Sequence, residues 1–248
     1  MKDVKDTLLE RRSIRRYERE AVTPEQMQFI FDAIRNTPTS YNGQQYSVID
    51  ISSQELKLKL EAITGQKQIK TCSRFLLFCA DYHKITLIGR EKGIEIPPFA
   101  ATMDGAVVGI VDASLAMMSA IVAVDAQGLG CCPIGFIRTA DPEAVCSLMN
   151  LPEGVFPVCG LAIGVPRELP DMHPKQPESA LIFTDSYATD ETLLRDLRAY
   201  DADVTRYNAT RSGTTSNNDW AAHILSYYSE GMSYHTREAM RRQGFDAL

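Results

Sequence analysis

Residues 102–127 constrain the fold more than any other stretch, because they are predicted to form one long and almost wholly apolar helix. At 1.5 Å per residue such a helix extends for about 38 Å. Its apolar residues lie nearly all round it, so it must be enclosed in the core of one subunit or between two. Its longest apolar stretch, residues 105–126, is interrupted by Asp112 and Asp125, and a carboxylate at mid-membrane costs about 3 kcal/mol. We therefore predict a buried helix and a dimer contact rather than a membrane span.

Hydrophobic spacing and capping signals place the remaining elements. Thr23-Pro24-Glu25-Gln26 is a capping box with proline at the first helical position, and Gly65 is typical of a helix C-cap. The predicted helices cover residues 2–11, 23–35, 54–64, 81–92, 141–149, 189–210, 219–229 and 236–243. Apolar or β-prone runs predict strands at 46–51, 74–80 and 155–165, and 128–135 is predicted to be a turn. With no internal repeat or linker, residues 1–248 are predicted to form a single domain.

Charge and cysteine content narrow the class of protein. The 26 basic and 32 acidic residues, with a net charge of -6, argue against a nucleic-acid-binding surface. The first six residues are polar and lack the apolar core of a signal peptide, and the six cysteines lie mostly in apolar surroundings. These features predict free thiols and a cytoplasmic protein.

The motifs for metal and nucleophilic chemistry are missing. His83, His173, His223 and His235 are scattered, and neither C-x-x-C nor H-E-x-x-H occurs. Adjacent cysteines at 131–132 are more typical of packing than of a metal site. Neither a G-x-S-x-G elbow nor a Walker A loop is found. We predict no metal, and we exclude the simplest hydrolases and kinases.

Four arginines within six positions, in the segment Glu10-Arg11-Arg12-Ser13-Ile14-Arg15-Arg16-Tyr17, indicate an anion site. Like charges this close repel unless an anion lies between them, and the guanidinium fork suits phosphate oxygens. The alternative is a solvated helix end whose arginines pair with the neighbouring acids Glu10, Glu18 and Glu20.

Four further segments offer polar side chains, or small residues that let a ligand approach the backbone closely. They are the hydroxyl- and amide-rich loop 37–45, Gln66-Lys67, the glycine-rich turn 128–135 and the basic, proline-rich segment 166–177. The 128–135 turn follows a predicted helix and its third glycine is displaced, which excludes a Rossmann fingerprint. Together with the arginine cluster, these segments fit a flat cofactor with a phosphate tail.

The ordered set of these segments resembles the nitroreductase family of flavoenzymes, over essentially the whole chain. Residues 11–17 are similar to the family's R-R-S-I-R-x-[FY] opening. The later segments are similar to the branch with NADPH-dependent oxygen-insensitive nitroreductases and luminous-bacterial flavin reductases. The resemblance implies an α+β fold, with a central mixed or antiparallel β-sheet of four or five strands wrapped by helices. It also implies an intertwined homodimer with FMN at each subunit interface. Residues 185–248 are predicted to form a helical C-terminal extension that contacts the partner subunit, with cover of its own subunit as the open alternative.

The resemblance also implies roles for single residues. Arg11, Arg12 and Ser13 would bind the phosphate and ribityl end of FMN. Arg15 would lie at the N1/O2 side of the isoalloxazine, where a cation stabilises the anionic reduced flavin. The other residues implied to border the cofactor are Thr39, Tyr41, Asn42 and Gln44 beside the ring, Gln66 at the pyrimidine or ribityl groups, and Pro133, Ile134 and Gly135 from the partner subunit.

Two departures from the branch affect the charged ends of the ligands. Where the branch has Lys-Pro-Arg at the FMN phosphate, this chain has His173-Pro174-Lys175, so a permanent charge becomes titratable. Arg211 matches an arginine that the branch uses for NADPH, whereas a second expected base is replaced by Ser216. The preference between NADPH and NADH therefore stays open.

The implied activity is an FMN-dependent NAD(P)H oxidoreductase with ping-pong turnover. NAD(P)H would pass a hydride to flavin N5, and a small-molecule acceptor (a nitroaromatic, quinone or flavin) would then replace it. Because the cofactor carries the chemistry, no protein residue is nominated as a general acid or base. Two alternatives stay open: a flavin reductase that supplies free reduced flavin, and a flavin-binding protein without turnover.

Overall fold

The computed structural model describes residues 1–213, 215–229 and 234–246. The chain divides into two compact units, one of residues 1–169 with 234–248 and the other of residues 170–233. The predicted extension at 185–248 spans parts of both units, and some of its residues lie outside the described ranges. Its contact with a partner subunit stays a prediction.

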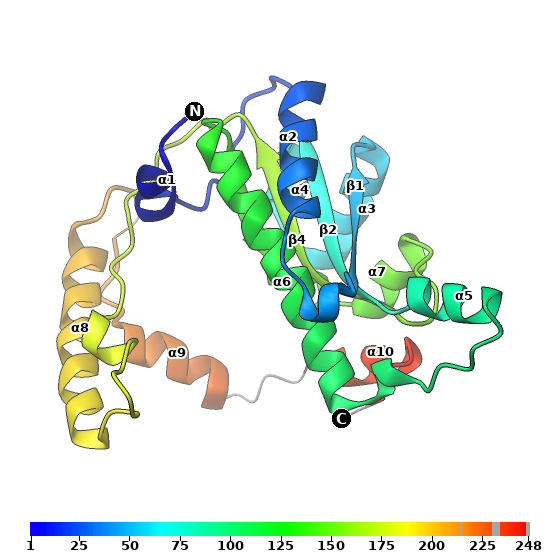
Figure 1. The fold of residues 1–248 in the computed structure, drawn as a ribbon. Helices are drawn as coiled ribbons and strands as arrows, with labels where there is room; N and C mark the ends of the chain where they lie inside the picture. Colours follow the sequence, from blue (N-terminus) through cyan, green and yellow to red (C-terminus); the bar gives the residue numbers. More distant parts are fainter. Residues whose placement is uncertain (214, 230–233, 247–248) are drawn as a thin grey trace. The chain divides into compact units, whose positions relative to one another are not determined.

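The described strands form one four-stranded antiparallel sheet in the first unit (Figure 1). Its order is β1 (Tyr46–Ile51), β2 (Arg74–Asp81), β4 (Val155–Gly164) and β3 (Gly130–Ile134). The central strands β2 and β4 are buried almost throughout, as their continuous apolar sequences predict. The mixed or antiparallel sheet and helical cover that the resemblance implies are confirmed.

The prediction of a simple turn at 128–135 is wrong, because residues 130–134 form β3. Pro133 lowered the expectation of a strand, since it cannot donate to a ladder. β3 is an edge strand that pairs only with β4 within the described sheet, so a missing N–H is tolerated. A Cβ on Gly130 would lie 2.9 Å from Ile14. Glycine at position 130 therefore permits the arginine-rich segment 10–17 to pack against β3.

The helices agree with the predicted ranges within a few residues, and a short helix, α4, was not predicted. Their bounds are α1 Val4–Glu10, α2 Pro24–Arg35, α3 Gln54–Thr64, α4 Lys67–Thr71, α5 His83–Glu91, α6 Met103–Ala126, α7 Pro142–Leu148, α8 Asp190–Thr210, α9 Trp220–Ser229 and α10 Thr236–Arg242. The capping box at α2 forms in full: Thr23 Oγ1 accepts from Gln26 N–H, and Gln26 Oε1 accepts from Thr23 N–H.

Helix α6 lies across one face of the sheet beside α2 (Figure 1). Small residues let it approach closely: Ala113, Ala116 and Ala120 are fully buried, and a Cβ on Gly109 would lie 2.8 Å from Ala80 Cβ. By length and hydropathy alone α6 would suit a membrane, yet 44% of its most apolar window is buried within the protein. The sheet and α2 thus bury one side of α6, as its apolar sequence requires.

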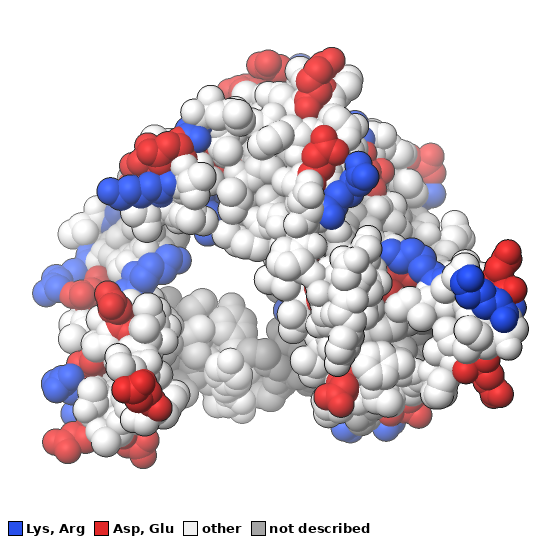
Figure 2. All heavy atoms as spheres, viewed as in Figure 1, with Lys and Arg blue, Asp and Glu red and all other residues white. Residues whose placement is uncertain are grey.

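The opposite side of α6 is an exposed apolar stripe. Its members recur at helical spacing and are Met103, Val107, Ile110, Val111, Leu115 and Met118. Figure 2 shows a surface over α6 that is largely free of charged side chains. An uncharged stripe of this length on a helix indicates a surface that another molecule covers.

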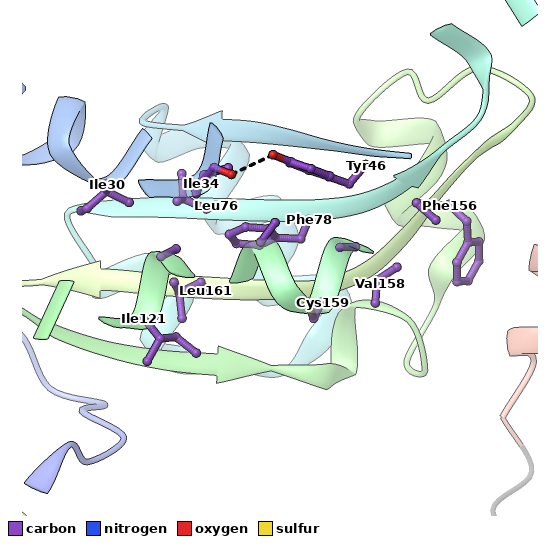
Figure 3. Close-up of a cluster of buried hydrophobic side chains, with 14 of the residues drawn as sticks. Ile30, Ile34, Tyr46, Leu76, Phe78, Ile121, Phe156, Val158, Cys159 and Leu161 are labelled. Carbon is purple, nitrogen blue, oxygen red and sulfur yellow. Dashed lines mark hydrogen bonds between the residues drawn. The ribbon is translucent and has the colours of Figure 1, made fainter. Parts of the chain in front are cut away.

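The hydrophobic core lies on both faces of the sheet because the side chains of β2 alternate. Leu76 and Phe78 point into the cluster shared with α2 and α6, which Figure 3 shows. Phe75 and Leu77 point into a second cluster on the other face. Tyr46 closes the first cluster, since its hydroxyl donates to the Ile34 carbonyl at 2.8 Å (Figure 3).

Candidate functional site

The arginine-rich segment is held between β3 and the chain that leaves β4. Ser13 forms a parallel bridge with Cys131, and Ile14 N–H donates to the Cys131 carbonyl at 2.9 Å. Tyr17 forms an antiparallel bridge with Pro166, and its buried hydroxyl donates to the Ile14 carbonyl at 2.6 Å. Arg15 and Arg16 lie between these two anchors, so their backbone is fixed while their side chains remain exposed.

A basic cavity of about 540 Å³ opens beside this segment. Its lining residues carry four cations and three polar groups, namely Arg15, Arg16, Lys67 and Arg167 with Tyr17, Gln68 and Thr71. The cations come from three places in the sequence: the arginine cluster, the start of α4 and the segment after β4. Arg16 also pairs with Glu168, at 3.6 Å between Nε and Oε2. The alternative of a purely solvated helix end does not account for this convergence.

The cavity wall connects Gln66 with the arginine cluster. Gln68 Nε2 donates to Gln66 Oε1 at 2.9 Å, and Gln68 also hydrogen-bonds the Cys132 thiol. Burial raises the pKa of Cys132, while the nearby guanidinium of Arg15 opposes the rise. Arg11 similarly opposes a burial effect that raises the pKa of Cys131 to about 12. Gln66, Arg15 and Arg11 thus lie in one region around β3. Their contact with a cofactor stays a prediction.

The loop with Thr39, Tyr41, Asn42 and Gln44 lies elsewhere in the same unit. Three of these residues have positive φ angles: 57° for Tyr41, 54° for Asn42 and 52° for Gln44. Such angles strain non-glycine residues and often occur at ligand sites. Thr39 Oγ1 accepts from Gln44 N–H at 3.1 Å, which closes the loop.

Neither Tyr41 nor Gln44 lines the basic cavity. Tyr41 lines a second cavity, of about 590 Å³ beside α5, and the residue is 90% exposed. Gln44 borders a third, smaller cavity with β1 and α2. Among the described residues, the loop and the arginine cluster therefore line different cavities.

Pro133, Ile134 and Gly135 stand where β3 ends and a short 3-10 helix begins. Ile134 is buried, whereas Pro133 is half-buried. A Cβ on Gly135 would lie 3.2 Å from the guanidinium of Arg138, which itself donates to the Val158 carbonyl at 3.0 Å. Their contact with a cofactor of the partner subunit stays a prediction.

In the second unit, His173 and Arg211 line one cavity of about 290 Å³. The His173 ring lies 5.1 Å from the ring of Tyr207, and Trp220 and Ser216 line the same cavity. His173 and Arg211, far apart in sequence, are thus brought together. Lys175 is exposed in the same extended segment as His173.

Two residues of the basic cavity, Gln68 and Thr71, lie outside the segments that the sequence had indicated. Arg16, Lys67 and Arg167 belong to those segments, but no individual role was assigned to them from the sequence. Within the described ranges no group of three His, Cys, Asp or Glu side chains is placed to hold a metal ion.

Comparison of the sequence with those of known protein families identifies the family to which the chain belongs. The profile of the Nitroreductase family matches residues 8–165. The chain belongs to the nitroreductase family. A profile described as the C-terminal domain of the same family matches residues 173–247, so both compact units have counterparts in it.

Relatives within the nitroreductase family match the chain along almost its whole length. It is 34% identical to the FMN reductase [NAD(P)H] of Bacillus subtilis, over 99% of this chain and 98% of the relative. It is 33% identical to the oxygen-insensitive NADPH nitroreductase of Salmonella typhimurium, over 86% and 85%. The solved structure of the hypothetical oxidoreductase YcnD from Bacillus subtilis superposes with a TM-score of 0.94, at 34% identity over 99% and 98%. The nitroreductase-like fold is therefore confirmed.

The residues of the basic cavity suit FMN. Three arginines and a lysine provide the charge and the forked donors that a phosphate or an anionic ring requires. The volume of about 540 Å³ lies within the range of small-molecule and cofactor sites. Gln68 in the cavity wall adds an amide that matches the polar edge of a flavin, and Gln66 lies behind it as its hydrogen-bond acceptor.

Proposed function

We propose that this chain is an FMN-dependent NAD(P)H oxidoreductase that reduces nitroaromatics, quinones or flavins by ping-pong turnover. The observation that carries the proposal is the basic cavity at Arg15, Arg16, Lys67 and Arg167, in a member of the nitroreductase family. Bound FMN would supply the hydride-transfer chemistry. Relatives named FMN reductase and NADPH nitroreductase support the same reaction class.

The protein's part is binding and electrostatics. The guanidinium of Arg15 lines the cavity and would stabilise negative charge that develops on the ring during reduction. Arg11, Arg12 and Ser13 would hold the phosphate and ribityl end. Protons would come from solvent, so no side chain is assigned as acid or base.

We propose that the active form is a homodimer. The exposed stripe on α6 provides an apolar surface for a second copy. The Tyr41 loop and the basic cavity are separate within one chain. In a dimer the loop of one subunit would border the FMN of the other, which reconciles the predicted residues with the geometry.

We propose that the cavity at His173 and Arg211 contributes to binding the charged ends of the ligands. Arg211 supplies a permanent cation for a nucleotide phosphate, and the rings of Tyr207 and Trp220 offer stacking surfaces. The absence of a basic side chain at Ser216 favours acceptance of both NADPH and NADH. The free thiols support a cytoplasmic location.

The test is a visible absorption spectrum of the purified chain, followed by anaerobic addition of NADPH and, separately, NADH. We expect an oxidised-flavin spectrum that bleaches with either nucleotide. A protein that takes up FMN but never bleaches would be a flavin-binding protein without turnover. A protein that takes up no FMN would contradict the proposal. Comparison of FMN with a nitroaromatic as acceptor then separates a flavin reductase from a nitroreductase.

A further inference from the structure

The backbone beside the basic cavity ends in an irregular antiparallel pairing. Around the Tyr17–Pro166 bridge, Glu18 N–H donates to the Val165 carbonyl at 2.9 Å, and Arg167 N–H donates to the Arg16 carbonyl at 3.0 Å. In a regular ladder the N–H of Arg16 would then donate to the carbonyl of Arg167, because opposed residues exchange both bonds. That bond is replaced.

The replacement acceptor is a side chain. Glu168 Oε1 accepts from Arg15 N–H at 2.8 Å and from Arg16 N–H at 3.1 Å. Its other oxygen, Oε2, faces Arg16 Nε at 3.6 Å, and the side chain is 25% exposed. Two consecutive backbone N–H groups form a small anion-binding concavity. In this protein an internal carboxylate occupies it.

We propose that Glu168 is a positioning residue of the cofactor site: it fixes the backbone of Arg15 and Arg16 so that their side chains line the cavity. The inference rests on the proposed function, since it assigns a role toward FMN. An acid beside a site for an anion costs affinity through charge repulsion. The two hydrogen bonds to the arginine backbone explain how Glu168 is tolerated there, because a fixed backbone lowers the entropy lost when the arginines bind.

The Cys132 thiol lies near the Arg15 guanidinium and the Glu168 carboxylate. Its pKa therefore depends on the position of Glu168 even when no cofactor is bound. Burial raises the pKa of Cys132, Arg15 and a hydrogen bond from Gln68 lower it, Glu168 raises it and Arg11 lowers it. The buried Tyr17 and Cys131 are further titratable neighbours. Removing the Glu168 charge should therefore lower the pKa of Cys132.

Two variants separate hydrogen bonding from charge. Glu168→Gln keeps an oxygen that can accept from both N–H groups, whereas Glu168→Ala removes it. We measure FMN affinity of the flavin-free protein by fluorescence titration. E168A should bind FMN about tenfold or more weakly, since hydrogen bonds to a charged group are worth at least that factor. E168Q should stay within about threefold of wild type.

The matched control is Glu18→Gln, which removes one exposed charge from the same segment and should change nothing. The second readout is the pH dependence of the reaction of Cys132 with methyl methanethiosulfonate, followed by peptide mass spectrometry. The apparent pKa should fall in E168Q and stay unchanged in E18Q.

The proposal is overturned if E168A binds FMN as tightly as wild type, or if E168Q loses as much affinity as E168A. An unchanged pKa of Cys132 in E168Q would overturn it as well, even if E168A fails to fold. If wild type binds no FMN, the proposed function fails. In that case the apparent pKa of Cys132, measured in the flavin-free protein, still tests whether Glu168 lies beside Arg15 and Arg16.

Discussion

The carboxylate of Asp112, fully buried on α6, accepts a hydrogen bond from the backbone N–H of Ser40 at 3.1 Å. Its second oxygen accepts from Gln45 N–H at 3.2 Å. A single residue of the central helix thus ties down both ends of the strained loop that carries Tyr41 and Asn42.

Substitution of Asp112 should destabilise the protein through this loop. Asp112→Asn places an amide N–H₂ against one of the two donors, so we expect the free energy of unfolding to fall by about 1–3 kcal/mol. Urea denaturation measures the loss. The control Ser114→Ala, on an exposed position of the same helix, should change it by less than about 0.5 kcal/mol. A D112N protein as stable as wild type would contradict the assignment.

Removal of the Arg15 side chain should weaken FMN binding. Loss of charge-assisted hydrogen bonds to the ligand predicts a dissociation constant about ten- to a hundredfold higher in Arg15→Ala. Fluorescence titration of the flavin-free protein gives the value. Arg19→Ala, an exposed arginine of the following segment, provides the comparison and should bind FMN normally. Equal affinity in both variants would remove Arg15 from the site.

Arg211→Ala should affect the nicotinamide nucleotide and leave FMN in place. We expect the KM for NADPH to rise about tenfold or more, because one cation for a phosphate is lost. Steady-state kinetics with NADPH and NADH, alongside FMN titration, separate the two ligands. Arg198→Ala on the exposed side of α8 is the matched control. An R211A protein that oxidises NADPH with wild-type kinetics would exclude the role.

The apolar stripe of α6 should hold two copies together. Val111 is 44% exposed in the single chain, and Val111→Glu would place a charge within the proposed dimer contact. Size-exclusion chromatography with light scattering should then show monomers. Leu87→Glu on α5, which is 49% exposed outside the stripe, should leave the dimer intact. If V111E remains dimeric, the stripe is not the contact.

Stability should fall in alkaline solution because of the buried thiols. Burial raises the pKa of Cys146 to about 11, and that of Cys131 and Cys159 to about 12, against about 8.5 in an unfolded chain. The folded state thus holds these protons more tightly. Their contribution is complete below about pH 8.5 and is lost as pH rises through 11–12. Urea denaturation between pH 7 and 10.5 should show the decline.

Cys159→Ser provides the comparison for the alkaline series. Serine does not titrate in this range, so the free energy of unfolding of C159S should fall less steeply with pH than that of wild type. A slope equal to that of wild type would show that this thiol does not contribute.

Local signals in the sequence determined much of the fold. The capping box at Thr23, the glycine C-cap at residue 65 and the apolar runs of β2 and β4 all lie where they were predicted. Each signal acts within a few residues, so it is independent of the rest of the chain. The arginine cluster and the order of the polar segments were likewise sufficient to indicate the family.

Only the tertiary structure decided how distant residues meet. Residues 130–134 become a strand because β4 offers an edge, although their composition favours a turn. In the sequence Glu168 is one acidic residue in a basic segment. In the structure the Tyr17–Pro166 pairing brings its carboxylate to the backbone of Arg15 and Arg16. In the sequence Asp112 only interrupts an apolar helix. In the structure its carboxylate accepts a hydrogen bond from the loop at Ser40. These pairings depend on contacts between residues 26 to 153 positions apart, which no periodicity or spacing within a segment encodes.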